Sequence, residues 1–173
     1  MKKLLAFFSV ILMAGSLYAK EVTLLMDWFP QGNQSGYWQA QFDNQYHDDV
    51  KITIKSGGPK INTTAAVASG QAEFGLQASD SVMLANAKGA GLKGIFVSLN
   101  HVPYTLVFHP NTGVNSVKDL DGRPFAVKMG VTYWKWVKHT YQLNAVKEFP
   151  LTGDLGLFAR TPQQFQQGYS LFL

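Results

Sequence analysis

Residues 51–80 read KITIKSGGPKINTTAAVASGQAEFGLQASD, and this stretch decides the fold class. Apolar and polar side chains alternate over residues 50–54, which predicts a strand with one polar face. The glycines and proline of residues 57–59 end this strand. Asn62 then favours the start of a short helix over residues 63–69, because its side chain can accept a hydrogen bond from a free amide and a glycine closes the run.

A second strand and helix follow at once. Residues 74–78 are predicted to form the strand, and Ser79 or Asp80 is predicted to cap the helix after it. Two strand ends are thus each followed by a helix start, which is where open α/β sheets bind small ligands through backbone amides. The pattern predicts a βαβ unit and a type of site, and it identifies no ligand.

The regions on either side extend the α/β pattern. Residues 22–26 predict the first strand, followed by the aromatic Asp-Trp-Phe-Pro sequence at 27–30 and a polar loop that leads to a helix near Tyr37. A helix is expected after Asp80, and the nearly continuous apolar run at residues 95–99 predicts a buried strand. Aromatic side chains beside a strand end and a polar loop suit the mouth of a ligand site.

The second half of the chain repeats the alternation. Strands are predicted at residues 105–108 and 124–128, with a helical turn that starts at Ser116 between them. Residues 130–142 predict an amphipathic helix, and its apolar face carries Tyr133, Trp134, Val137 and Tyr141. The basic residues of this helix are explained by a solvated opposite face, so nucleic-acid binding is not expected.

The N-terminus predicts a secretory signal peptide over residues 1–19. Two lysines precede an apolar core that is only about half as long as the roughly 20 residues of a spanning helix, so no stable membrane insertion is expected after its removal. Removal after Ala19 takes away two lysines and lowers the formal charge from +4 to +2. The sequence contains no cysteine, which excludes disulfides, thiolate metal sites and a lipid-modified cysteine. These features predict an exported, periplasmic protein of bacterial type.

No motif of a cofactor or metal site stands in a suitable context. Residues 89–94 match G-x-G-x-x-G, but they leave a predicted helix and enter a predicted strand, the reverse of the dinucleotide-binding order. The histidines have no metal-ligand spacing, and no serine lies in a G-x-S-x-G elbow. We therefore expect no cofactor, no metal and no catalytic residue.

Several motifs together resemble one family, the solute-binding proteins of the no-message-in-thiamine group, which deliver thiamine pyrimidine precursors to ABC transporters. The resemblance extends from near residue 20 to Tyr169 and rests on DWFP at 27–30, SGGP at 56–59, ASGQAEFG at 68–75, SD at 79–80, SVKDLDG at 116–122, TGDLG at 152–156 and QQGY at 166–169. It implies a two-lobed α/β fold of the periplasmic-binding-protein type II class, closing on a ligand between the lobes. The expected organisation is a signal peptide at 1–19, a first lobe at 20–104 and a second lobe at 105–173.

The resemblance stops at Tyr169. Members of the family continue well beyond this point, so the chain resembles a truncated or frameshifted product whose second lobe, and whose return to the first lobe, are incomplete. Apolar strand faces would then remain uncovered, which predicts poor stability or aggregation unless a second chain supplies the rest.

The resemblance also implies which residues bind the ligand. Flat aromatic faces suit a planar ring, and backbone amides, hydroxyls and carboxylates suit its polar edge. For some of these residues the alternative is a structural role, as packing for Trp28, Tyr37 and Trp134, or as turns and caps for the residues of the two loops. The expected ligand-binding residues are Trp28, Phe29, Tyr37, Gly57, Gly58, Asn62, Ser79, Asp80, Met129, Gly130 and Trp134, with Trp38 as a weaker candidate.

The expected function is that of a non-enzymatic substrate-binding component of an ABC importer. It would bind a formylaminopyrimidine or hydroxymethylpyrimidine type of precursor and dock on a permease. Three alternatives stay open: another solute such as nitrate, a sulfonate or a different pyrimidine; a pyrimidine synthase; or a truncated product without function. The resembling fungal synthase uses a cysteine-rich motif with iron, and the absence of cysteine argues against an enzyme.

Overall fold

The computed structural model describes residues 19–43, 45, 49–101 and 103–170. The predicted signal peptide lies outside these residues, apart from Ala19. Within the described ranges, no helix is both long and apolar enough to cross a membrane.

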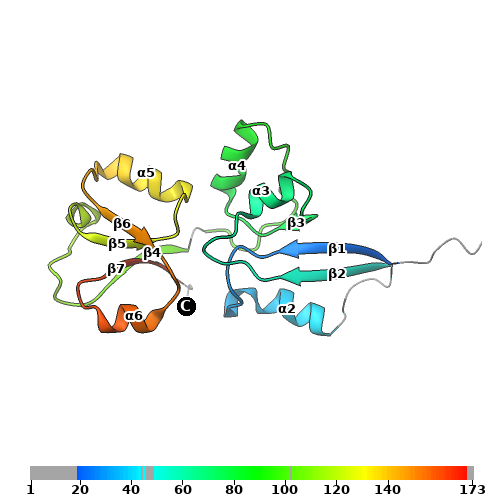
Figure 1. Cartoon of the computed structure of the whole chain (residues 1–173), viewed down its shortest axis with the longest axis horizontal. Helices are drawn as coiled ribbons and strands as arrows, with labels where there is room; N and C mark the ends of the chain where they lie inside the picture. The colour runs from blue at the N-terminus through cyan, green and yellow to red at the C-terminus, as the bar shows by residue number, and fades with distance from the viewer. Residues whose placement is uncertain (1–18, 44, 46–48, 102, 171–173) are drawn as a thin grey trace, which may run out of the picture.

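The first lobe is built on a parallel sheet in the order β2-β1-β3. Leu24 of β1 lies opposite Ile54 on one side and Phe74 on the other. Figure 1 shows α2 on one side of the β1–β2 pair and α3 and α4 on the other. The elements are β1 (Lys20–Leu25), η1 (Gly32–Gln34), α2 (Ser35–Phe42), β2 (Val50–Lys55), α3 (Thr63–Ala68), β3 (Phe74–Gly75) and α4 (Ser79–Ala87).

The second lobe is built on a mixed sheet in the order β4-β7-β5-β6. Strand β5 runs parallel to β6 and β7, and β4 runs antiparallel to β7. Helices α5 and α6 lie on opposite sides of this sheet in Figure 1. The elements are β4 (Tyr104–Phe108), η2 (Val117–Leu120), β5 (Pro124–Val127), α5 (Thr132–Tyr141), β6 (Lys147–Pro150), α6 (Leu155–Arg160) and β7 (Phe165–Tyr169). The expected two-lobed α/β architecture is confirmed.

The core of the second lobe forms where the apolar face of α5 meets the sheet. Its buried members are Leu120, Phe125, Val127, Trp134, Leu143 and Phe165. Tyr133, Val137 and Tyr141 pack against this cluster, so the amphipathic helix predicted over residues 130–142 is confirmed in type and orientation. The turn predicted from Ser116 is also present, because the side chains of Ser116 and Asp119 form a capping box around η2.

The two helix starts that follow the first sheet differ in their caps. Asn62 caps α3 as predicted, since its Oδ1 accepts a hydrogen bond from the Ala65 amide at 3.1 Å. The predicted cap of α4 by Ser79 or Asp80 is wrong: Ala78 is the N-cap residue, and it makes no side-chain cap hydrogen bond within the described chain. The Asp80 carboxylate instead accepts a hydrogen bond from the adjacent Ser81 amide.

The strand predicted over residues 95–99 is also wrong. The segment is irregular, and the side chains of Ile95 and Phe96 are 76% and 75% exposed. A run with apolar side chains on both faces forms a strand only where neighbouring strands and covering helices enclose it. No described strand pairs with this segment. Its apolar side chains therefore remain on the surface.

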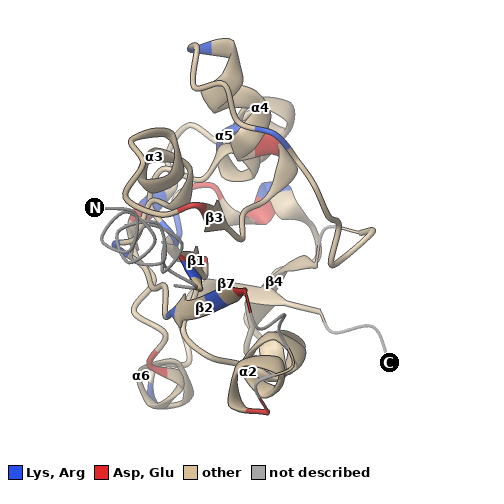
Figure 2. Ribbon diagram, turned by 90° about the vertical axis from the view of Figure 1, so that its right-hand side faces the viewer, with Lys and Arg blue, Asp and Glu red and all other residues tan. Residues whose placement is uncertain are grey.

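The parallel strands of the two lobes point toward each other. In Figure 1 the arrowheads of β1 and β2 face the second lobe, and the arrowhead of β6 faces the first lobe. Helices α4 and α5 contact each other across the lobes, and they lie together again in the turned view of Figure 2. The carboxyl ends of both sheets thus meet, which positions the loops that follow them between the lobes.

Candidate functional site

A lysine from the second lobe contacts the first lobe directly. Lys128, the residue after β5, donates a hydrogen bond from Nζ to the backbone oxygen of Asp27 at 3.0 Å. The same ammonium lies 5.3 Å from the centre of the Trp28 ring, within the range of a cation–π interaction. We call Asp27, Trp28, Phe29 and Lys128 the interlobe junction. It joins the loops at the carboxyl ends of two parallel strands, β1 and β5.

The Asp27 side chain is held in place by a buried glutamine. Gln34 is only 1% exposed and donates a hydrogen bond from Nε2 to Oδ1 of Asp27 at 3.1 Å. Burial raises the pKa of the Asp27 carboxyl, and the positive charge of Lys128 only partly opposes this effect. Burial likewise lowers the pKa of Lys128, against the opposing influence of Asp27. For each of the two groups, the cost of losing hydration is therefore larger than the favourable interaction with the opposite charge.

Glycine backbones surround the aromatic pair of the junction. Trp28 and Phe29 meet edge to face with 5.6 Å between ring centres. A Cβ atom on Gly58 would lie 3.2 Å from the Phe29 ring, and one on Gly153, which follows β6 with a φ of 82°, would lie 3.8 Å from it. The rings are thus approached by backbone from both lobes.

A cluster of tyrosines lies on the second-lobe side. Tyr104 of β4 stacks on Tyr133 of α5 with 4.2 Å between ring centres and meets Tyr169 of β7 edge to face at 5.2 Å. Burial raises the pKa of all three hydroxyls. The negative charge of Asp27 contributes to the increase in the pKa of Tyr104 and Tyr169, which places the cluster near the interlobe junction. The Tyr133 hydroxyl is buried and has no hydrogen-bond partner among the described residues.

The structure brings part of the predicted site together. Trp28 and Phe29 belong to the interlobe junction, and Gly57 and Gly58 pack against the chain that carries these two residues. The negative charge of Asp80 contributes least among the causes that raise the pKa of Tyr104, and the ligand role of Asp80 remains a prediction.

Other predicted residues lie next to this group or have local roles. Met129 and Gly130 directly follow Lys128; Met129 is exposed, and Gly130 has a φ of 79°. Asn62 caps α3, Ser79 is the exposed first residue of α4, and Tyr37 is a half-buried residue of α2. The ligand roles of all these residues remain predictions.

Trp134 is placed differently from the expectation. It is 3% exposed and stacks on Phe125 with 4.4 Å between ring centres, inside the core of the second lobe. The apolar face of α5 turns this ring toward the sheet, which leaves it no face for a ligand. The site prediction for Trp134 is therefore corrected to a core role.

Sequence reasoning did not select several residues of this region. The residues outside the predicted set are Asp27, Gln34, Tyr104, Lys128, Tyr133 and Tyr169. Two of them carried a signal. Asp27 opens the Asp-Trp-Phe-Pro motif, and Lys128 directly precedes the predicted Met129 at the end of a strand.

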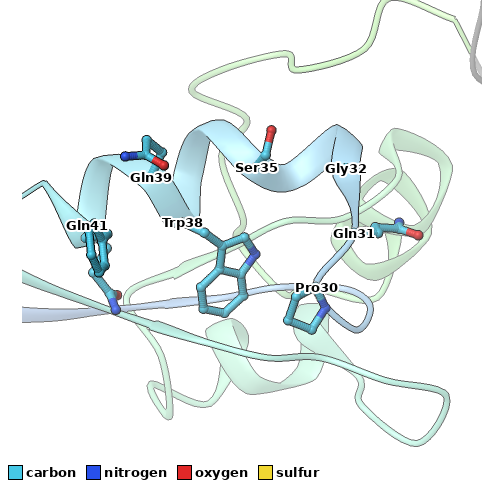
Figure 3. A pocket seen from close by; sticks show the side chains of 8 residues that line it. Pro30, Gln31, Gly32, Ser35, Trp38, Gln39 and Gln41 are labelled. Atoms are coloured by element: carbon cyan, nitrogen blue, oxygen red, sulfur yellow. The ribbon is translucent and has the colours of Figure 1, made fainter.

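A separate hollow of about 660 Å³ lies beside α2. Figure 3 shows the Trp38 ring below the helix, with Pro30 and Gln31 at one end. Trp38 Nε1 is buried without a hydrogen-bond partner in the described part of the chain. The lining residues are Pro30, Gln31, Gly32, Ser35, Trp38, Gln39, Gln41 and Phe42.

The side chains offer no evident metal centre. The described residues contain no group of three or more His, Cys, Asp or Glu side chains able to hold an ion. In the view of Figure 2, the basic and acidic positions are spread along the ribbon. The residues of the interlobe junction offer aromatic faces, hydrogen-bonding groups and two opposite charges.

Comparisons with known proteins place the sequence in a family. The NMT1/THI5-like family profile matches residues 33–145. The chain is 30% identical over 112 residues to the 4-amino-5-hydroxymethyl-2-methylpyrimidine phosphate synthase of Legionella pneumophila, covering 64% of this chain and 35% of the relative. The chain thus spans about a third of the length of this curated relative. Among solved structures, the L-cystine solute receptor of Neisseria gonorrhoeae in its unliganded open conformation matches with a TM-score of 0.31 and 13% identity, over 90% of this chain and 70% of the receptor.

Replacing Lys128 with methionine is expected to weaken the link between the lobes. The variant keeps an unbranched side chain but loses the hydrogen bond to Asp27 and the cation over Trp28. Because Lys128 is half-buried and the loss of its charge also removes a desolvation cost, we expect a decrease of about 1 kcal/mol in the free energy of unfolding. Urea denaturation followed by circular dichroism measures this change. Lys135→Met, on the exposed side of α5, is the matched control; equal effects of the two changes would contradict a specific role for Lys128.

Proposed function

Because the chain belongs to the NMT1/THI5-like family, we propose that it binds a small heteroaromatic molecule between its two lobes and serves as the substrate-binding component of an ABC importer. The proposed ligand is a thiamine pyrimidine precursor of the formylaminopyrimidine or hydroxymethylpyrimidine type. The proposed site combines the interlobe junction with Gly57, Gly58, Asp80, Met129 and Gly130. In this proposal the lobes close on the ligand by hinge motion and then dock on a permease.

One observation carries the proposal most directly. Lys128 of the second lobe reaches the backbone of Asp27 and the face of Trp28 in the first lobe. Aromatic faces, a carboxylate and an ammonium therefore gather where the carboxyl ends of two parallel strands meet, the usual position of ligand sites in α/β folds. A planar heterocycle with polar substituents uses each of these groups.

The proposed organisation follows the sequence. Removal of residues 1–19 would deliver the protein to the periplasm, with a first lobe over residues 20–104 and a second lobe over residues 105–173. Permease docking and transport belong to this proposal, as does the location.

A pyrimidine synthase is the second candidate function, and it is favoured by the name of the Legionella relative. Expression of residues 20–173 in the cytoplasm of a strain that requires the thiamine pyrimidine distinguishes the two functions. A binding protein does not restore growth without added pyrimidine, whereas a synthase does.

Isothermal calorimetry with 4-amino-5-hydroxymethyl-2-methylpyrimidine or its formylamino precursor tests binding on the purified chain. Trp28→Ala removes a stacking face next to Asp27, so we expect its affinity to decrease by about tenfold to a hundredfold. Trp136→Ala is the matched control, because Trp136 is 61% exposed on α5. A folded wild-type protein that binds neither pyrimidine would contradict the proposed ligand class.

A further inference from the structure

We propose that the carboxyl group of Asp27 is a specificity-determining group, which pairs with the amino group and the adjacent ring nitrogen of an aminopyrimidine. This inference rests on the proposed function, and it names the edge of the ligand that the site recognises. It assigns a role to a side chain that the sequence-based site did not include.

The position of the carboxyl group is fixed from two directions. Gln34, which is almost fully buried, donates a hydrogen bond to Oδ1 of Asp27. The backbone oxygen of Asp27 accepts a hydrogen bond from Lys128 of the other lobe. The aspartate also follows β1 directly and precedes Trp28, so its carboxyl and the indole come from adjacent residues. A group held in this way loses little conformational entropy when it binds a ligand.

The charge of the carboxyl is not fully compensated inside the protein. Lys128 is the cation whose field acts on Asp27, yet burial has the larger effect and raises the pKa of the carboxyl. The negative charge of Asp27 also contributes to the raised pKa of Tyr104 and of Tyr169. A ligand that brings N–H donors or a positive charge would supply the missing compensation.

An aminopyrimidine has the matching edge. Its amino group donates a hydrogen bond, and the ring nitrogen beside it either accepts a proton or already carries one. A protonated ring therefore offers two parallel N–H donors to the carboxylate, as a guanidinium does. A neutral ring forms the same pair with a protonated carboxyl, which donates to the ring nitrogen and accepts from the amino group. In both forms one proton is shared and no bond to carbon changes.

The neighbouring ring completes the geometry. Pairing at the edge lies in the plane of the heterocycle, whereas stacking acts on its face, so two adjacent residues can supply both contacts. Trp28 already carries the Lys128 ammonium over its face, which indicates that this face suits a cation or an electron-poor ring. Asp80 is a weaker candidate for the pair, because its carboxylate is bonded to the next amide in its own helix.

The test compares two ligands and two variants by calorimetry. The probes are 4-amino-5-hydroxymethyl-2-methylpyrimidine and the analogue that lacks the 4-amino group. Loss of a charge-assisted pair is expected to reduce affinity by about tenfold or more. We therefore expect the wild-type protein to prefer the amino compound by this factor and Asp27→Leu, which keeps the approximate size but has no polar group, to lose the preference, with the affinity of the analogue changed by no more than about twofold. Asp49→Leu, at an exposed acid elsewhere in the first lobe, is the matched control and should bind both probes as wild type does.

Each other outcome is decisive. Equal binding of both probes to the wild-type protein, an unchanged preference in folded Asp27→Leu, or an equal loss of both probes in that variant overturns the role of Asp27 while the proposed function stands. If folded wild-type protein binds neither probe and also does not bind the formylamino precursor, the proposed function is contradicted and this inference with it. If Asp27→Leu does not fold by circular dichroism, Gln34→Met serves instead, because it removes the hydrogen bond that anchors the carboxyl without changing the charge of the carboxyl. An unchanged preference for the amino compound in folded Gln34→Met would then overturn the inference.

Discussion

Replacing Gly57 with alanine is expected to decrease the free energy of unfolding of the first lobe by about 3 kcal/mol, the upper end of the usual overpacking effect. Gly57 is buried where the loop after β2 crosses the chain that leaves β1. A Cβ atom there would lie 2.6 Å from the backbone nitrogen of Trp28 and closer still to the carbonyl oxygen of Met26. Backbone cannot move aside as a flexible side chain can, so the two loops must separate.

The same displacement has a functional consequence. The Gly57 amide donates to the Trp28 carbonyl at 3.1 Å, so separation of the loops breaks this bond and moves the indole. Urea denaturation with circular dichroism measures the loss of stability, and calorimetry with the aminopyrimidine measures the accompanying loss of affinity. Gly36→Ala is the matched control: it lies inside α2 with no atom of the described structure within 4 Å of its added Cβ, and should stabilise the helix slightly. A stability of Gly57→Ala equal to that of Gly36→Ala would contradict the close approach of the loops.

Local chemistry explains what could be predicted from the sequence. The cap at Asn62 depends on its own side chain and an amide three residues later. The buried face of α5 depends on the helical spacing of its aromatic residues. Interactions of this kind depend on residues close together in the sequence, so they can be predicted from the spacing of the residues.

Long-range contacts explain what could not. The bond from Lys128 to Asp27 joins residues separated by 101 positions, and neither residue carries a pattern that specifies the other. The strand prediction for residues 95–99 is wrong for a different reason. The composition of this segment favours a buried strand, but no described strand pairs with it. A sequence pattern indicates which environment a strand or helix requires, whereas the rest of the chain determines whether neighbouring strands and helices provide that environment.

The interlobe junction combines features that favour function over stability. A half-buried carboxyl with a raised pKa and a half-buried ammonium with a lowered pKa each oppose the folded state in their charged forms. Core packing alone would favour apolar side chains at both positions. A ligand that pairs with these groups would recover this free energy on binding, which is consistent with a binding site at the meeting of the two sheets.

Replacing Trp134 with alanine is expected to decrease the free energy of unfolding by about 4 kcal/mol, as for other large aromatic residues removed from a core. The indole fills the centre of the second lobe and stacks on Phe125. Trp134→Phe should cost far less, because it keeps a ring and removes an Nε1 group that has no partner among the described residues. Trp136→Ala, on the exposed part of α5, is expected to change stability by no more than about 0.5 kcal/mol.

The pair of Trp134 variants separates a core role from a ligand-binding role. Urea denaturation gives the stability of each variant, and calorimetry with the aminopyrimidine gives its affinity. In a core role, stability decreases strongly in Trp134→Ala, and folded Trp134→Phe binds the pyrimidine as wild type does, because the ring contacts Phe125 and not the ligand. In a ligand-binding role, Trp134→Ala would remain stable and lose affinity. The burial of this ring beneath α5 makes the first result the expected one, and it would support the proposal that the ligand stacks on Trp28 and not on Trp134.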